Sequence, residues 1–285
     1  MTLKHFTILK NAKKKLKKCG ITTYRIDAQI LLSKILNLDN IGDLLFKEPT
    51  IVEDDYNKFK ILLNRRLQHE PIAYIIGSKN FWKQDYIINR DVLIPRPETE
   101  LIIELVLQKF TKVINKQLNI LDLGTGSGCI ILSLLSEFKL SIGVGVDRSK
   151  KALQIATINA ANLNINNRVK FVLSNWFDNL NYRQKFDIIV SNPPYISNNE
   201  WISLERSVKN FEPKKALTDS KDGLESYRII EKNVLQFLKK GGILILEIGY
   251  NQQQIIQQIF KSTIYRIKFY QDLQNIVRVA MINKY

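Results

Sequence analysis

The sequence predicts an α/β fold with a mostly parallel sheet, preceded by a small all-helical N-terminal domain. From Asn119 onwards, short apolar runs rich in β-branched residues alternate with amphipathic helical segments. Residues 1–80 instead show helical spacing without strand alternation. Because alternating strands and helices form parallel sheets with helices on both faces, the two patterns predict two domains. A chain of 285 residues is long enough for both.

Residues 1–80 are predicted to form a helical bundle. Ile8, Ala12 and Leu16 recur at four-residue spacing and define the buried face of the first helix. The lysines around them lie mostly on other faces, which is typical of a solvated surface. Thr22 or Thr23 is expected to cap the second helix. Two further helices are expected over residues 39–45 and 52–67.

In residues 81–96 the helical spacing gives way to short apolar runs, and this segment is predicted to form a β-hairpin that connects the two domains. Its polar turn would lie at residues 89–91. The two strands are expected over residues 86–88 and 92–94. Pro97 then opens a helix, since proline suits the first helical position. The larger domain therefore spans residues 97–285.

The larger domain alternates between strands and helices along most of its length. Each expected strand is short and apolar, and each expected helix carries an apolar stripe. Strands are expected over residues 120–123, 142–146, 169–173, 186–190, 243–248, 264–269 and 276–282. Helices are expected over residues 128–138, 150–162, 224–238 and 252–260, with a turn at Gly241-Gly242.

Composition is typical of a globular cytoplasmic protein. The chain is 45% hydrophobic and 25% charged, and no apolar run approaches the length of a membrane span. No membrane partner is therefore expected. Cys19 and Cys129 have neither metal-ligand nor redox spacing, so no metal is expected and a reducing cytosol fits them. The net charge of +16 admits direct nucleic-acid binding. A biased genome composition rich in Lys, Ile and Asn is the alternative explanation of that charge.

A glycine-rich turn joins the first strand of the larger domain to its helix. Gly124-Thr125-Gly126-Ser127-Gly128 carries glycine at alternate positions, which lets the backbone turn sharply and approach a ligand closely. Asp147 lies 19 residues beyond Gly128 at a strand end, where its carboxylate would accept hydrogen bonds from both ribose hydroxyls of a nucleoside. A nucleoside-cofactor site is predicted here, with a purely structural turn as the alternative.

The second candidate site follows the strand at residues 186–190. In Asn192-Pro193-Pro194-Tyr195 the two prolines lack N–H groups and have fixed φ, so the backbone is stiff and extended. The Asn192 side-chain oxygen and the Pro193 carbonyl then form two fixed acceptors for a planar –NH2 group, and Tyr195 offers a flat stacking face. Trp176, after the third strand, is placed to cover an adenine, with core packing as its alternative.

This order of motifs resembles the S-adenosylmethionine-dependent amino-methyltransferases, and it resembles the HemK/PrmC branch more closely. The likeness runs over nearly the whole chain. Pro-Arg-Pro-Glu-Thr-Glu together with Asn-Pro-Pro-Tyr is highly specific for that branch. The segments that carry the likeness are residues 65–71, 73–77, 81, 95–100, 192–195, 212–213, 216–217, 223–224 and 227–228.

The resemblance implies a Rossmann-like methyltransferase domain and a helical substrate-recognition domain at residues 1–80. It implies methyl transfer from S-adenosyl-L-methionine to the side-chain nitrogen (N5) of the glutamine in the GGQ motif of class-I peptide chain release factors, with S-adenosyl-L-homocysteine as product. Translation termination would be the process supported. The release factor is the implied partner, and a cytoplasmic monomer is expected.

The same resemblance implies roles for individual residues. Cofactor contacts are implied at Gly124, Thr125, Gly126, Ser127, Gly128, Asp147, Trp176 and Asn192. Substrate contacts are implied along Asn192, Pro193, Pro194 and Tyr195, of which Asn192, Pro193 and Tyr195 are the catalytic candidates. One departure affects adenine binding, because Asn175 stands where the family usually has Asp.

Three alternatives stay open at this point. A DNA adenine-N6 or RNA base methyltransferase also acts on a conjugated –NH2 group, after flipping the base out of its stack. No residues beyond the closing strands are assigned to a target-recognition domain, which counts against it. A non-catalytic RNA- or ribosome-binding protein on the same scaffold leaves Asn-Pro-Pro-Tyr unused. An NAD oxidoreductase gives that motif no role either.

Overall fold

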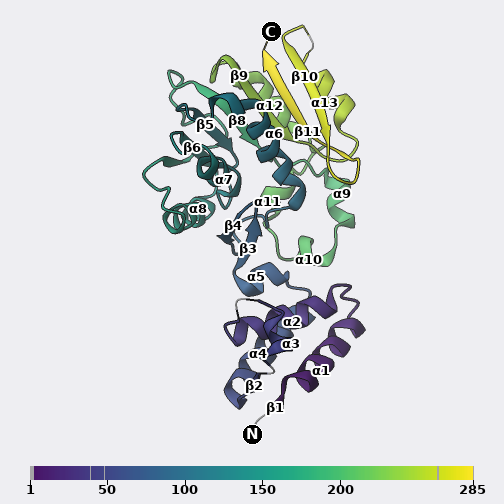
Figure 1. The fold of residues 1–285 in the computed structure, drawn as a ribbon. Helices are drawn as coiled ribbons and strands as arrows, with labels where there is room; N and C mark the ends of the chain where they lie inside the picture. Colours follow the sequence, from purple (N-terminus) through teal and green to yellow (C-terminus); the bar gives the residue numbers. More distant parts are fainter. Residues whose placement is uncertain (1–2, 39, 48, 262, 285) are drawn as a thin grey trace. The chain divides into compact units, whose positions relative to one another are not determined.

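The computed structural model describes residues 3–38, 40–47, 49–261 and 263–284 (Figure 1). The chain separates into two compact units. The first contains Met1–Gly77 and Glu205–Phe211, and the second contains Ser78–Leu204 and Glu212–Tyr285. The prediction placed the boundary after residue 80 and assigned residues 205–211 to the larger domain.

The first unit consists of helices around an apolar core. Its helices are α1 (His5–Lys18), α2 (Tyr24–Ile35), α3 (Asp43–Phe46), α4 (Glu53–Leu67), α5 (Ile72–Ile76) and α10 (Arg206–Lys209). Ile8, Ala12 and Leu16 are buried in its core, as their spacing predicts. The pairing of β1 (Leu3–Lys4) with β2 (Thr50–Ile51) was not predicted. The first residue of the helix expected at 39–45 lies outside the described residues.

A buried ion pair joins α2 to α4 within this unit. Arg66 Nε donates to Asp27 Oδ2 at 2.7 Å, and the Asp27 side chain is 3% exposed. Thr23, at the N-cap of α2, donates its hydroxyl to the same carboxylate oxygen at 2.7 Å. The predicted capping residue therefore bonds a side chain of the first turn. Because both donors bond the same buried carboxylate, the first turn of α2 is tied to the last turn of α4.

The second unit contains a seven-stranded sheet with the order β10-β11-β9-β8-β5-β6-β7. The five strands from β9 to the edge strand β7 pair in parallel, whereas β11 pairs antiparallel with β9 and β10 pairs antiparallel with β11. The strands are β5 (Asn119–Leu123), β6 (Ile142–Asp147), β7 (Val169–Leu173), β8 (Phe186–Ser191), β9 (Leu238–Glu247), β10 (Tyr265–Gln271) and β11 (Val277–Lys284). A mostly parallel sheet is therefore confirmed.

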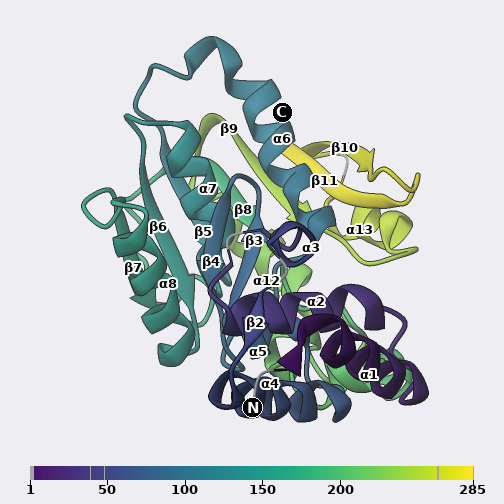
Figure 2. The same ribbon diagram turned by 60° about the horizontal axis from the view of Figure 1, so that its bottom comes forward.

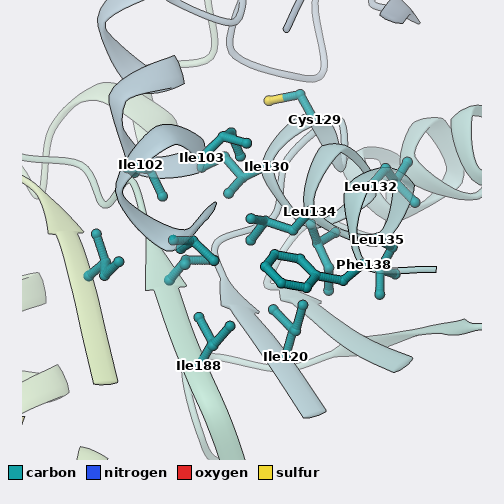
Figure 3. Close-up of a cluster of buried hydrophobic side chains, with 14 of the residues drawn as sticks. Ile102, Ile103, Ile120, Cys129, Ile130, Leu132, Leu134, Leu135, Phe138 and Ile188 are labelled. Atoms are coloured by element: carbon teal, nitrogen blue, oxygen red, sulfur yellow. The ribbon is translucent and has the colours of Figure 1, made fainter. Parts of the chain in front are cut away.

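Helices cover both faces of this sheet (Figure 2). On one face, α6 and α7 pack on Ile120 and Ile188 of β5 and β8, as Figure 3 shows. On the other face, α12 and α13 pack on Leu121 and Ile189 of the same strands. Neighbouring strand residues thus point to opposite cores, as the period of two requires. The helices are η1 (Pro97–Thr99), α6 (Glu100–Phe110), η2 (Thr111–Val113), α7 (Cys129–Glu137), α8 (Lys150–Asn162), α9 (Asn198–Ser203), α11 (Lys214–Leu217), α12 (Glu225–Val234) and α13 (Gln253–Ile259).

The predicted β-hairpin is present, but its position was wrong. The strands are β3 (Ser78–Phe81) and β4 (Gln84–Ile87), and no strand is assigned within residues 88–96. The chain turns at Trp82, whose φ is +55°. Its backbone N–H donates to Glu100 Oε1 and its indole N–H donates to Glu137 Oε1, both at 2.7 Å. These bonds to distant helices stabilise a turn that local sequence preferences do not indicate.

The predicted turn at Gly241-Gly242 was also wrong, because β9 continues through both glycines. Gly241 has a φ of +77°, and the register of β9 against β8 shifts next to Asp187. A Cβ on Gly242 would lie 3.0 Å from the Phe186 carbonyl oxygen. The glycines therefore allow a bulged strand to approach its neighbour closely, in place of a chain reversal.

We expect Asp27→Asn to destabilise the protein by about 3–5 kcal/mol, because it removes the charged partner of Arg66, whose side chain is only 12% exposed and otherwise bonds the Glu70 carbonyl. Asp54→Asn is the matched control, since Asp54 is 73% exposed in its ion pair with Lys58 and should cost less than about 1 kcal/mol. Urea unfolding monitored by circular dichroism measures both. Equal effects of the two substitutions would contradict the prediction.

Candidate active site

The candidate site lies where the strand order of the sheet reverses. β5 pairs with β6 on one side and with β8 on the other, and all three strands are parallel. The loops that follow β5 and β8 therefore leave the same edge of the sheet and diverge. Such a switch point is where ligands bind in open parallel sheets. Both motifs singled out from the sequence, at residues 124–128 and 192–195, occupy these two loops.

The glycine-rich turn has the backbone conformation that its composition predicts. Gly124, Gly126 and Gly128 have φ values of +74°, +56° and +81°, where a Cβ would be strained. The N–H groups of Gly124 and Thr125 donate to the Val146 carbonyl at 2.9 and 2.8 Å. Strand β6 therefore anchors the turn, and α7 begins immediately after Gly128.

Asp147 lies at the carboxyl end of β6 and faces the same turn. Its Oδ2 accepts from the Gly126 N–H at 2.9 Å, and its Oδ1 accepts from the Ser149 N–H at 2.8 Å. Burial raises the pKa of this carboxyl, while the backbone N–H donors act in the opposite direction. These contacts hold the carboxylate plane beside the glycine turn.

A cavity of about 490 Å³ joins the two loops. Its volume lies within the range of roughly 300–1,000 Å³ that small-molecule sites occupy. Six of the predicted site residues line it, together with Asn175 and residues of the segments 90–93 and 213–216. The six are Gly124, Gly126, Asp147, Trp176, Asn192 and Pro194.

The remaining cofactor candidates lie within the turn and do not line this cavity. Thr125 and Ser127 are buried, and Gly128 packs so tightly that a Cβ would lie 3.0 Å from Leu132 Cδ1. Thr125 donates its hydroxyl to Asp122 Oδ2 at 2.7 Å. Asp122 is fully buried, and burial raises its pKa to about 7. These side chains shape the turn, so their predicted contact with a cofactor would be made through the backbone.

The loop after β7 places Trp176 in the cavity wall. Trp176 has a φ of +53°, and its carbonyl accepts the Ser174 hydroxyl at 2.9 Å. The indole is half-buried and packs against the apolar core on one face of the sheet. Asn175 donates its amide to Asp178 Oδ2 at 3.1 Å and also lines the cavity. Trp176 therefore lines the cavity and also packs against the core.

The Asn192–Tyr195 segment is held from two sides. Asn192 Nδ2 donates to Thr99 Oγ1 at 3.2 Å, and Pro193 is buried. The Pro194 carbonyl accepts the Ser226 hydroxyl at 3.2 Å. Tyr195 does not line the cavity; its hydroxyl donates to Glu247 Oε1 at 3.0 Å, and burial raises its pKa.

Two residues of this site were not identified from the sequence. In the sequence, Thr99 belongs to a segment that resembles the family, and Glu247 lies within an expected apolar strand. Glu247 ends β9 and is buried, which raises the pKa of its carboxyl, although the Thr99 and Tyr195 hydroxyls counteract this shift. A carboxylate at the end of an otherwise apolar strand was the available signal.

The sheet order, the glycine turn after β5 and the Asn-Pro-Pro-Tyr segment after β8 are those of a Rossmann-like methyltransferase domain. Residues 114–277 match the family model described as a methyltransferase domain, and residues 7–77 match the PrmC N-terminal domain. The chain belongs to the HemK/PrmC family.

Curated relatives cover nearly the whole chain. It is 42% identical over 254 residues to the release factor glutamine methyltransferase of Buchnera aphidicola subsp. Schizaphis graminum, covering 89% of each chain. It is 44% identical over 294 residues to the bifunctional methyltransferase of Rickettsia typhi, covering 97% of this chain and 56% of that protein. The chain thus spans about half the length of such bifunctional relatives.

Solved structures support the fold. A methyltransferase from Pyrococcus furiosus matches with a TM-score of 0.52 and 18% identity, covering 80% of this chain and 96% of that one. At this identity the likeness concerns the fold alone. Separately, none of the helices in the described segments is long and apolar enough to span a bilayer.

We expect Asp122 to make the unfolding free energy depend on pH. The folded-state pKa of Asp122, about 7, exceeds the ordinary value of 3.8. The stabilisation that this carboxyl contributes to the folded state is therefore fully present below about pH 4 and is lost as pH rises through 7. Asp122→Asn should remove this loss, which amounts to on the order of 4 kcal/mol. Urea unfolding of both proteins between pH 4 and 8 tests this, and parallel pH profiles would refute it.

Proposed function

We propose that this chain transfers a methyl group from S-adenosyl-L-methionine to the side-chain nitrogen (N5) of the glutamine in the GGQ motif of class-I peptide chain release factors, and so supports translation termination. One observation carries the proposal: Asn192 and Pro194 line the same cavity as the glycine turn and Asp147. An acceptor suited to an amide thus lies beside a nucleoside-type pocket. Family membership and the names of relatives such as that from Buchnera aphidicola support this substrate.

The residues of the cavity fit S-adenosyl-L-methionine. Gly124 and Gly126 leave the space beside the turn open, because a Cβ on either would meet no atom closer than 4.0 Å. Asp147 offers carboxylate oxygens suited to ribose hydroxyls, and Trp176 offers an apolar face suited to an adenine. When bound, this cofactor supplies an electrophilic methyl group on a sulfonium.

The side-chain amide of glutamine is a poor nucleophile because its nitrogen lone pair is delocalised. The Asn192 oxygen and the Pro193 carbonyl would accept its two N–H groups and hold the nitrogen in one orientation. Fixed acceptors of this kind favour pyramidalisation of the nitrogen, because they require no reorganisation as the reaction proceeds. Tyr195 lies outside the cavity, so in place of the predicted stacking on the amide plane it would hold the segment through its hydrogen bond to Glu247. Positioning and fixed dipoles are therefore the proposed sources of catalysis.

The proposal also sets the partner and the compartment. A release factor is the macromolecular substrate, and translation places the reaction in the cytoplasm. The helical first unit would recognise the release factor. The net charge of +16 is compatible with a substrate that works on RNA, but the proposed reaction requires no direct contact with nucleic acid. We propose that the chain acts as a monomer.

We expect labelled methyl groups to appear on a class-I release factor incubated with this protein and methyl-labelled S-adenosyl-L-methionine. A release factor whose GGQ glutamine is replaced by alanine should remain unlabelled, because the accepting nitrogen is then absent. Scintillation counting and peptide mass spectrometry measure the transfer. Labelling of added RNA or DNA, with none of the release factor, would contradict the proposal and support a base methyltransferase.

Asn192→Ala should lower kcat by about 10²–10³-fold, since it removes one fixed acceptor of the reacting amide. The Kd for S-adenosyl-L-methionine, measured by calorimetry, should change much less. Asn199→Ala, at an exposed position on α9, is the matched control and should leave both quantities unchanged. Unaltered turnover of Asn192→Ala would remove the role assigned to this residue.

A further inference from the structure

A chain of side-chain hydrogen bonds connects Asn192 to a buried carboxylate. Asn192 Nδ2 donates to Thr99 Oγ1 at 3.2 Å, and Thr99 Oγ1 donates to Glu247 Oε2 at 2.5 Å. Thr99 and Glu247 are each 2% exposed. The three residues come from η1, the end of β9 and the loop after β8, so tertiary folding alone brings them together.

The direction of this chain follows from the chemistry of its groups. Glu247 accepts through both of its oxygens, from the hydroxyls of Thr99 and Tyr195, whereas a hydroxyl has one hydrogen to donate and lone pairs to accept with. Because the Thr99 hydrogen points to Glu247, Thr99 offers only a lone pair to Asn192. The Asn192 carboxamide must then turn its NH2 group towards Thr99, which leaves its oxygen at the opposite end of the amide plane.

The orientation matters because the two ends of a carboxamide have opposite hydrogen-bonding character. With the oxygen facing the substrate, Asn192 accepts an N–H of the glutamine amide. With the carboxamide rotated by a half-turn, an NH2 group would face another NH2 group. That arrangement places donors against donors and removes one of the two acceptors on which the proposed reaction depends.

The same carboxylate also holds the other end of the motif. Glu247 Oε1 accepts the Tyr195 hydroxyl at 3.0 Å, and the Tyr195 carbonyl accepts from Gln252 Nε2 at 3.0 Å. A Cβ on Gly249 would lie 3.1 Å from the Tyr195 ring and 2.8 Å from Gln252 Oε1, so only glycine fits there without displacement. Glu247 is therefore connected to both ends of the motif, to Asn192 through Thr99 and to Tyr195 directly.

We propose that Glu247 is a positioning residue that sets the orientation of the Asn192 carboxamide through Thr99, so that the Asn192 oxygen faces the substrate amide. The inference rests on the proposed function for its catalytic consequence. Its structural content, the orientation of one side chain, stands independently. Thr99 transmits the effect, and neither Thr99 nor Glu247 needs to touch the substrate.

The test compares Thr99→Val with Thr99→Ser, which differ in the hydroxyl that carries the chain. Thr99→Val should lower kcat for release-factor methylation by about 10–100-fold, because the accepting oxygen loses its fixed orientation. Thr99→Ser should keep kcat within about threefold, and the KM for S-adenosyl-L-methionine should stay within the same range in both. Glu247→Leu, which removes both acceptor oxygens, should behave like Thr99→Val, and the double variant should be no worse than either single one.

Ser133→Ala is the control for loss of a buried hydroxyl in the same unit, because the Ser133 hydroxyl bonds the Tyr86 hydroxyl at 2.7 Å away from the cavity. Its kcat should equal that of the wild type. Thermal unfolding of each variant identifies any that lacks the folded structure. If Glu247→Leu does not fold, the Thr99 pair still decides the question.

A second readout needs neither cofactor nor substrate. In ¹⁵N-labelled protein, the side-chain NH2 signals of Asn192 should keep their chemical shifts and slow hydrogen exchange in Thr99→Ser. In Thr99→Val they should shift and exchange faster. Equal spectra and equal kcat for the two variants would overturn the inference. If the wild type does not methylate release factors, the proposed function fails, and the spectra alone then decide on Glu247.

Discussion

Parallel pairing of β8 with β5 is the constraint on which the rest of the structure depends. The strand order reverses at this pair, so two loops distant in sequence leave one sheet edge next to each other. One loop contributes the glycine turn, and the other contributes Asn192–Tyr195. The apolar alternation of both strands, with Ile120 and Leu121 entering opposite cores, secures the register that this arrangement needs.

Rigidity at the site comes from the backbone first and from side chains second. The glycine turn is held by bonds to the Val146 carbonyl, and the proline pair stiffens the second loop. Side chains then supply orientation, which backbone geometry does not determine. Thr99 and Glu247 do this for Asn192, and Gln252 does it for Tyr195. A reaction that relies on positioned acceptors needs both a rigid backbone and oriented side chains.

Three carboxyl groups lie near the site, at or near the carboxyl ends of parallel strands. They belong to Asp122, Asp147 and Glu247, and burial raises the pKa of each. Burying a carboxyl is unfavourable, so each is compensated by hydroxyl or backbone donors. Placing them at one sheet edge concentrates acceptors where a nucleoside and an amide are proposed to bind.

The sequence by itself determined the α/β class, most strands and helices of the larger unit, and the two motifs at its sheet edge. These features are local, since a glycine turn and a proline pair specify their own backbone. Only the tertiary structure decided the hairpin position, where Glu100 and Glu137 stabilise the turn at Trp82. It also decided the contact between Thr99 and Glu247, which lie 148 residues apart. A side chain can orient another only when folding brings the two within hydrogen-bond distance. Local sequence patterns do not predict such contacts between residues far apart in the chain.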